Sequence, residues 1–160
     1  MTCLQRTEKP TMQRAALLAL TAATVMSVSA CSHAMMMIGG TGAKRPAATE
    51  FGLGPRSSAR GLYVAALETD GRLRPRQMQT VRVTVVGADG RTVDSASLTI
   101  DGGMPRHGHG LPTRPRVTRN LGAGVYVIEG VRFNMGGWWE FKIAIATDRG
   151  TDTVIFNLDL

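Results

Sequence analysis

Apolar and polar residues alternate along most of the chain that follows Gly61. Between residues 80 and 86, for example, Val81, Val83 and Val85 are separated by polar residues. A period of two places the apolar side chains on one face of a β-strand. Similar runs recur at intervals of roughly 8–12 residues, separated by turn residues, and no amphipathic helix interrupts them. The pattern predicts an all-β, Ig-like antiparallel β-sandwich of about seven strands over residues 61–160.

Turn residues divide this region into segments of strand length. We predict strands at residues 62–67, 80–86, 92–100, 115–119, 125–129, 138–146 and 153–158. The Asp89-Gly90 pair is a hairpin signal and predicts that strands 80–86 and 92–100 are neighbours. Residues 101–112 are expected to form a long loop, and Pro115 favours an edge position for the strand that follows it.

The inward positions of these strands define the expected core, in which Tyr126 competes with Val125 and Val127 for the inner face. The predicted core residues are Val81, Val83, Val85, Leu98, Ile100, Tyr126, Trp139, Phe141, Ile143, Val154, Phe156 and Leu158. A domain of this size can bury enough surface to fold without a disulfide.

Residues 12–31 have the layout of an export signal: a basic start at Arg14, an apolar run over residues 15–28, and then small residues. The run is shorter than the roughly 20 residues that span a bilayer. Val28-Ser29-Ala30-Cys31 resembles the bacterial lipobox, where cleavage precedes a cysteine that receives lipid. The sequence predicts a lipoprotein signal peptide over residues 1–30, with Met12 as a candidate true start. The alternative is a signal peptide without lipidation or an uncleaved anchor.

A lipid on Cys31 would hold the protein to a membrane of the cell envelope, facing the periplasm. Ser32 resembles a sorting signal for the outer membrane, which favours that membrane over the inner one. Residues 31–60 are rich in Gly, Ala, Ser, Pro and Thr without periodicity, and predict a flexible tether.

The net charge of the chain excludes few classes of binding partner. The net charge is +7, and it falls to +5 when residues 1–30 are removed. The remaining charges are scattered, with no basic helix and no basic stripe interleaved with aromatics, so nucleic acid is a poor partner. The charge indicates either solubility alone or a weak attraction to anionic lipid headgroups.

Three segments carry a family resemblance: MPRHGHG at 104–110, GVY at 124–126 and VRFNMGGWWE at 131–140. They resemble the YtkA-like/FixH-like envelope domains, which share an M-P-x-H-x-H-G-like loop, a G-x-Y step and an F-x-M-x-G-x-W-E stretch. The resemblance covers about residues 81–160. It implies an Ig-like fold, and some members belong to systems for copper supply or cytochrome oxidase assembly. FixH-type members carry a transmembrane helix where this chain has a predicted lipid anchor, which weakens an oxidase-assembly role.

The loop in the first of these segments is a candidate metal site. His107 and His109 are two residues apart, so in extended backbone they would point to one side. Met104 is near in sequence, and Met135 could approach from another loop. Two imidazoles and two thioethers suit copper, whereas zinc would need a third histidine or a carboxylate, with Asp101 the nearest.

A structural role for these residues is the alternative. The imidazoles would then bind backbone groups or pack on Trp138, and Met104 and Met135 would fill gaps in the core. The protein would be a purely structural or protein-interaction lipoprotein, with an envelope protein as partner and the sheet edges or Trp138 as the contact.

Catalysis has little support in the sequence. No cysteine follows Cys31, no serine lies in a nucleophile elbow, and the glycines at 39–42 lack the Lys-Ser/Thr ending of a phosphate loop. We therefore predict a non-catalytic envelope lipoprotein that binds a metal ion, for which the ligand types favour copper, or a protein partner through residues 104–109.

Overall fold

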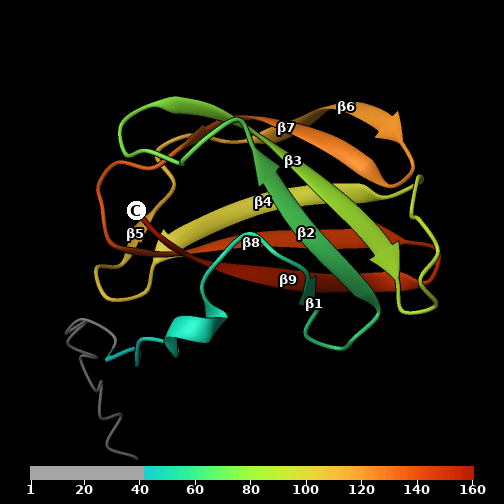
Figure 1. The fold of residues 1–160 in the computed structure, drawn as a ribbon, viewed down its shortest axis with the longest axis horizontal. Helices are drawn as coiled ribbons and strands as arrows, with labels where there is room; N and C mark the ends of the chain where they lie inside the picture. The colour runs from blue at the N-terminus through green and yellow to red at the C-terminus, as the bar shows by residue number, and fades with distance from the viewer. Residues whose placement is uncertain (1–41) are drawn as a thin grey trace, which may run out of the picture. The chain divides into compact units, whose positions relative to one another are not determined.

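The computed structural model describes residues 42–160, in which two β-sheets pack face to face (Figure 1). The predicted signal peptide, Cys31 and the first part of the predicted tether lie outside the described residues. The five-stranded sheet has the order β1 (Arg56–Ser57), β2 (Tyr63–Thr69), β3 (Met78–Gly87), β7 (Val125–Arg132) and β6 (Arg116–Gly122). The four-stranded sheet has the order β5 (His109–Gly110), β4 (Ser97–Met104), β8 (Trp138–Thr147) and β9 (Gly150–Asp159).

The predicted β-sandwich is confirmed. The seven expected strands correspond to the seven longer ones, and the two-residue strands β1 and β5 are additional. β6 is an edge strand, as Pro115 predicted. In the described part, the one further element is a 3-10 turn at Ala48–Glu50 (η1), and no helix there is long and apolar enough to cross a membrane.

The predicted hairpin between strands 80–86 and 92–100 is wrong beyond its turn. The turn forms, because Gly87 N–H donates to Arg91 O at 2.8 Å, and one bridge joins Val86 to Thr92. The chain then crosses to the other sheet, where β4 pairs with β8. One further bond joins the two segments, from Val93 N–H to Val85 O at 3.1 Å. Along the rest of β3, β2 and β7 occupy both edges, so the pairing with the chain that leads to β4 does not continue.

Tyr126 fixes this crossover. Its ring is buried opposite Val83, and its hydroxyl donates to Val93 O at 2.7 Å and accepts from Ala96 N–H at 3.0 Å. Burial raises the pKa of Tyr126, against the lowering effect of the bond from Ala96. The tyrosine therefore faces inward as predicted, although Val127 on the other face is buried too.

The core lies between the inner faces of the sheets. Ten of the twelve predicted core residues are buried, and the other two, Leu98 and Ile100, are partly buried and pack against the core. Residues outside that list of twelve fill the rest of it: Tyr63, Ala65, Leu67, Leu73, Met104, Ile128, Val131, Phe133 and Ile145. Among the described residues, the members of the core cluster and the hydrophobic residues packed on it all lie between Leu53 and Leu160, so residues 42–160 contain these contacts.

The second half of the predicted tether belongs to the folded domain, which corrects the boundary expected at Gly61. Leu53 packs on the core, Phe51 forms a bridge with Asn157, and β1 pairs with β2. The segment lacks the alternation that marks a longer strand because it supplies single anchoring residues.

A buried polar network holds this segment to β9. The Asp152 side chain is 3% exposed, and its Oδ2 accepts from Arg60 N–H at 2.9 Å and from Leu62 N–H at 3.3 Å. Ser58 is also buried, and its hydroxyl accepts from Tyr63 N–H at 2.9 Å and bonds to the carboxylate. Burial alone would raise the pKa of Asp152, but these hydrogen bonds, with that from Thr153 N–H, lower it below its ordinary value.

Candidate functional site

The β4–β5 hairpin carries both histidines of the described chain. The expected long loop is instead a four-residue turn, because β4 continues to Met104 and β5 begins at His109. The N–H groups of His107 and Gly108 both donate to Met104 O at 3.0 Å. Gly108 has φ +64°, a left-handed conformation that glycine adopts without steric cost. The hydrogen-bonded turn fixes the backbone of both histidines.

The two imidazoles lie side by side in solvent. Their ring planes differ by 6°, their centroids are 6.3 Å apart, and both residues are exposed. Neither ring forms a hydrogen bond to another group of residues 42–160. The sequence predicted that they share a side because of extended backbone, but His107 lies in the turn, so the hairpin is the cause. The alternative in which backbone groups bury and hold the imidazoles does not describe this hairpin.

The two candidate methionines lie in different surroundings. Met104 pairs with His109 across the hairpin, but it is 2% exposed and belongs to the core. Its methyl group approaches Gly137, where an added Cβ would be 3.1 Å away. Met135 is 36% exposed, and no hydrogen bond or ring contact in the described part joins it to either imidazole. The structure therefore brings together two of the four candidate ligands.

Charged groups beside the hairpin are paired with one another. Glu140 and Lys142 form an ion pair at 2.9 Å and line a shallow hollow beside Gly103 and His109. Asp101 accepts from Gly102 N–H at 2.7 Å. Within residues 42–160, no three or more His, Cys, Asp or Glu side chains are grouped so that they could hold a metal ion. A zinc site completed by a carboxylate therefore has no support.

Trp138, the other candidate contact, is unavailable to a partner. It is 6% exposed, and its Nε1 donates to Asn157 Oδ1 at 2.9 Å. Trp139 is fully buried, and its Nε1 donates to Met135 O at 3.0 Å. The Trp138 indole thus joins the start of β8 to β9, and the Trp139 indole joins β8 to loop 133–137.

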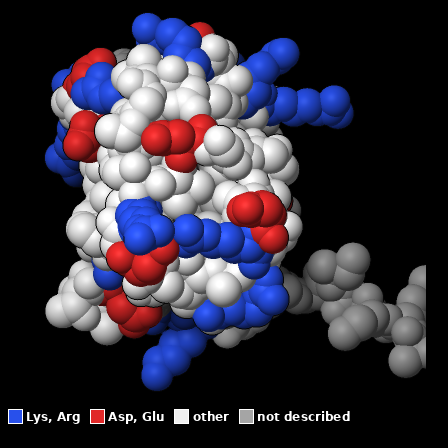
Figure 2. Space-filling view, turned by 90° about the vertical axis from the view of Figure 1, so that its right-hand side faces the viewer, with Lys and Arg blue, Asp and Glu red and all other residues white. Residues whose placement is uncertain are grey.

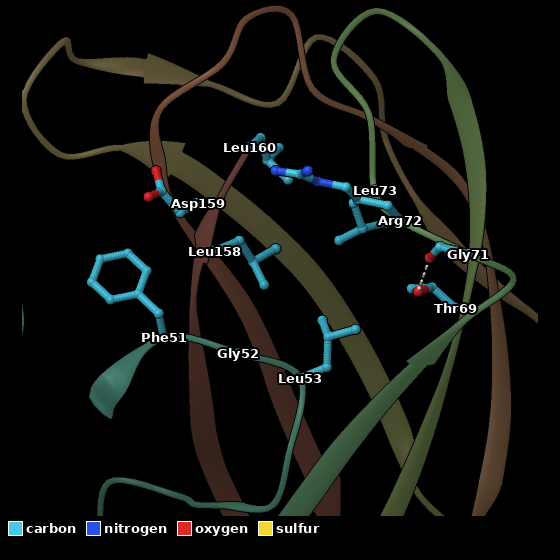
Figure 3. Close-up of a pocket in the computed structure, with 10 residues that line it drawn as sticks. All are labelled: Phe51, Gly52, Leu53, Thr69, Gly71, Arg72, Leu73, Leu158, Asp159 and Leu160. Atoms are coloured by element: carbon cyan, nitrogen blue, oxygen red, sulfur yellow. Dashed lines mark hydrogen bonds between the residues drawn. The ribbon is translucent and has the colours of Figure 1, made fainter. Parts of the chain in front are cut away.

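An apolar pocket of about 280 Å³ opens between the N-terminal segment, the β2–β3 connection and the end of β9 (Figure 3). Leucine side chains form its wall, and Arg72 extends over it toward Leu160 (Figure 3). Of its charged residues, Asp159 is bound to Arg45 at 2.6 Å, and Arg72 has no carboxylate partner in the described chain. The pocket therefore offers no pair of titratable groups for acid–base catalysis.

The fold and the hairpin define a class of protein: an antiparallel β-sandwich that presents two histidines on a tight turn. The family model of the YtkA-like proteins matches residues 60–144, more than half of the chain, and the chain belongs to the YtkA-like family. The match ends within β8. No curated protein matches the chain. No solved structure matches it either. The family suggests an envelope-associated domain and is not known for catalysis.

Proposed function

We propose that this protein is a non-catalytic envelope lipoprotein whose sandwich binds one copper ion through His107 and His109. The observation that carries the proposal is the pair of exposed, parallel imidazoles on a hydrogen-bonded turn. Imidazole nitrogen is a ligand for copper, and for a given nitrogen site copper(II) binds more tightly than nickel or zinc. A turn that already fixes the backbone reduces the ordering cost of chelation.

The residues present fit a partial copper site rather than a closed one. Two imidazoles would supply two ligands, and water or a partner protein would complete the shell. Met104 is held in the core, although its position opposite His109 places its backbone beside the site. An ion held by two protein ligands exchanges readily, which suits a protein that passes copper to another envelope protein.

Copper binding is tested on residues 42–160, which contain the described core. Thermal unfolding is followed with and without copper(II), copper(I) and zinc(II). Binding raises the midpoint, because a ligand at a hundredfold excess over its dissociation constant adds about 2.7 kcal/mol of stability. Electron paramagnetic resonance of the copper(II) form should show nitrogen coupling from two imidazoles.

The variant His107→Ala/His109→Ala should abolish both the thermal shift and the nitrogen coupling. Met135→Leu is the matched control: it should leave the copper(II) spectrum unchanged, and a weaker response to copper(I) alone would add its thioether to the site. An equal shift in the double-alanine variant, or no shift with copper, contradicts the proposal.

We also propose the anchor expected from the sequence: lipid on Cys31, a periplasm-facing domain, and the outer membrane in preference to the inner. Mass spectrometry of the exported protein tests it. An acylated N-terminal Cys31 supports the anchor, and a chain that retains residues 12–30 contradicts it.

A protein partner remains the second proposal, and it is favoured by one feature. β6 is an edge strand that pairs with β7 on one side only, so its other side is open to a further strand. The edge strand of the other sheet, β9, is partly covered, because Gly52 N–H and Ala59 N–H donate to Asn157 O and Thr153 O. A partner strand could add to β6. Pro substitution at Thr118, in the middle of this edge, should remove such binding without changing the copper response.

A further inference from the structure

Unpaired arginines gather at one end of the sandwich. Arg72, Arg74 and Arg76 lie in the β2–β3 connection, and Arg132 ends β7 in register with Met78. All four arginines are exposed, and none forms an ion pair within residues 42–160. No acidic side chain of the described protein therefore compensates their charge. The four arginines are not consecutive in the sequence, so no run of basic residues reveals this cluster.

This end, which we call the hairpin end, consists of residues 70–77, the β4–β5 hairpin, loop 133–137 and Leu160; it lies on the left of Figure 1. The chain reaches the domain here. Arg106 Nε donates to Ala43 O at 3.4 Å, and Arg45 pairs with Asp159 at 2.6 Å.

The place where the chain arrives favours the hairpin end as the one nearer to a membrane. Gly42 follows Cys31 by 11 residues, which span at most about 40 Å. The ten-residue strand β8 alone spans about 34 Å. If Cys31 carries lipid, as proposed above, the hairpin end can rest on the bilayer and the opposite end lies about one strand length further away.

Apolar side chains accompany the arginines. Met78 is 64% exposed, and its register opposite Arg132 places both side chains on one face of the sheet. Met135, 36% exposed, lies in another loop of the same end. Exposed apolar residues beside cations are typical of surfaces that rest in the headgroup region of a membrane.

The opposite end is built differently. Arg149 pairs with Asp89 at 3.0 Å, and Arg60 approaches Asp152 at 4.0 Å. Figure 2 shows this end, with acidic and basic side chains adjoining one another. Arg91, in the turn beside Asp89, has no ion pair in the described residues, so the opposite end mixes paired and unpaired cations, whereas Arg72, Arg74, Arg76 and Arg132 are all unpaired.

We infer that the hairpin end is a membrane-docking surface, in which Arg72, Arg74, Arg76 and Arg132 bind the phosphates of anionic phospholipids and Met78 enters the interface. An acidic protein segment would satisfy the arginines equally well. The membrane is favoured because the tether brings it to this end and because an acidic segment gives no role to Met78.

The test measures sedimentation of residues 42–160 with vesicles of phosphatidylcholine, with or without 30% (about one lipid in three) phosphatidylglycerol. This fragment lacks Cys31, so its binding to vesicles can be interpreted even if the lipid-anchor proposal is wrong. The test variant is Arg72→Gln/Arg74→Gln/Arg76→Gln. The control, Arg91→Gln/Arg119→Gln/Arg149→Gln, removes the same charge away from the hairpin end, and circular dichroism confirms that both variants fold.

Wild type should bind anionic vesicles in low salt and not neutral ones. The test variant should bind on the order of a hundredfold more weakly, given the worth of about three basic residues near a charged surface, and the control less than about threefold. Met78→Gln should weaken binding to vesicles several-fold and leave binding to soluble polyglutamate unchanged.

Three results would overturn the inference. If the wild-type fragment has no affinity for anionic vesicles, the hairpin end is not a membrane-docking surface. Equal losses in the test and control variants assign the binding to net charge. Vesicle binding that is indifferent to Met78→Gln and matched by polyglutamate assigns the surface to an acidic protein segment.

Discussion

Replacement of Asp152 by Ala should destabilise the domain strongly, because one buried carboxylate holds the N-terminal segment to β9. The change removes the acceptor of the Arg60 and Leu62 N–H groups and the partner of the Ser58 hydroxyl. Hydrogen bonds to a charged group contribute about 1.5–3 kcal/mol, and donors left unsatisfied add to the loss. We expect a loss of about 3 kcal/mol, which lowers the midpoint of thermal unfolding by about 10 °C for a domain of this size.

Asp152→Asn is the matched control, since it keeps the shape and one acceptor oxygen but removes the charge. It should cost about 2 kcal/mol near neutral pH. The pKa of Asp152 is lower in the folded protein than its ordinary value, so the unfolded chain binds more protons in acid. The stability from the carboxylate is therefore complete above the ordinary pKa of about 3.9 and is lost as the pH falls through the folded value.

Calorimetry or circular dichroism of wild type and Asp152→Asn from pH 7 to pH 2 measures this dependence. The two melting temperatures should converge in the acidic part of the range. A constant difference down to pH 2, or a difference that grows in acid, would refute the assignment of the stability to the ionised carboxylate.

Two further predictions concern the backbone and the domain boundary. Gly124→Ala should cost more than about 3 kcal/mol, because its Cβ would lie 2.3 Å from Val85 O, whereas Gly122→Ala, with similar φ and nothing within 4 Å, should cost only about 1 kcal/mol; equal losses in urea unfolding would contradict this. A fragment that begins at Gly61 should have a free energy of unfolding at least about 2 kcal/mol lower than that of residues 42–160, since it loses Leu53 from the core and the β1–β2 pairing. Equal stability of the two fragments would show that residues 42–60 are a tether and not part of the domain.

Much of the fold could be predicted from single strands. Val81, Val83 and Val85 are buried because a period of two leaves no other arrangement for a half-buried strand. Pairing partners could not be predicted this way. The Asp89-Gly90 turn is present, yet β4 leaves β3, because that choice depends on β2 and β7 occupying both edges.

The candidate site divides in the same way. Residue types and spacing identified His107 and His109, and the hairpin presents them together. The same spacing could not show that Met104 faces the core while Met135 is exposed. Ser58 and Asp152 gave no sequence signal, because each is an ordinary polar residue until the fold buries the two together.

Local alternation and composition are enough to define the class of fold, the strand positions and the residue types available for chemistry. The packing of the whole domain sets which strands are neighbours, where the domain begins and which charges lie close together. Arg72 and Arg132 are 60 residues apart in the chain, yet both lie at the hairpin end. Distances across a sandwich depend on the packing of all its strands, and no local pattern contains that information.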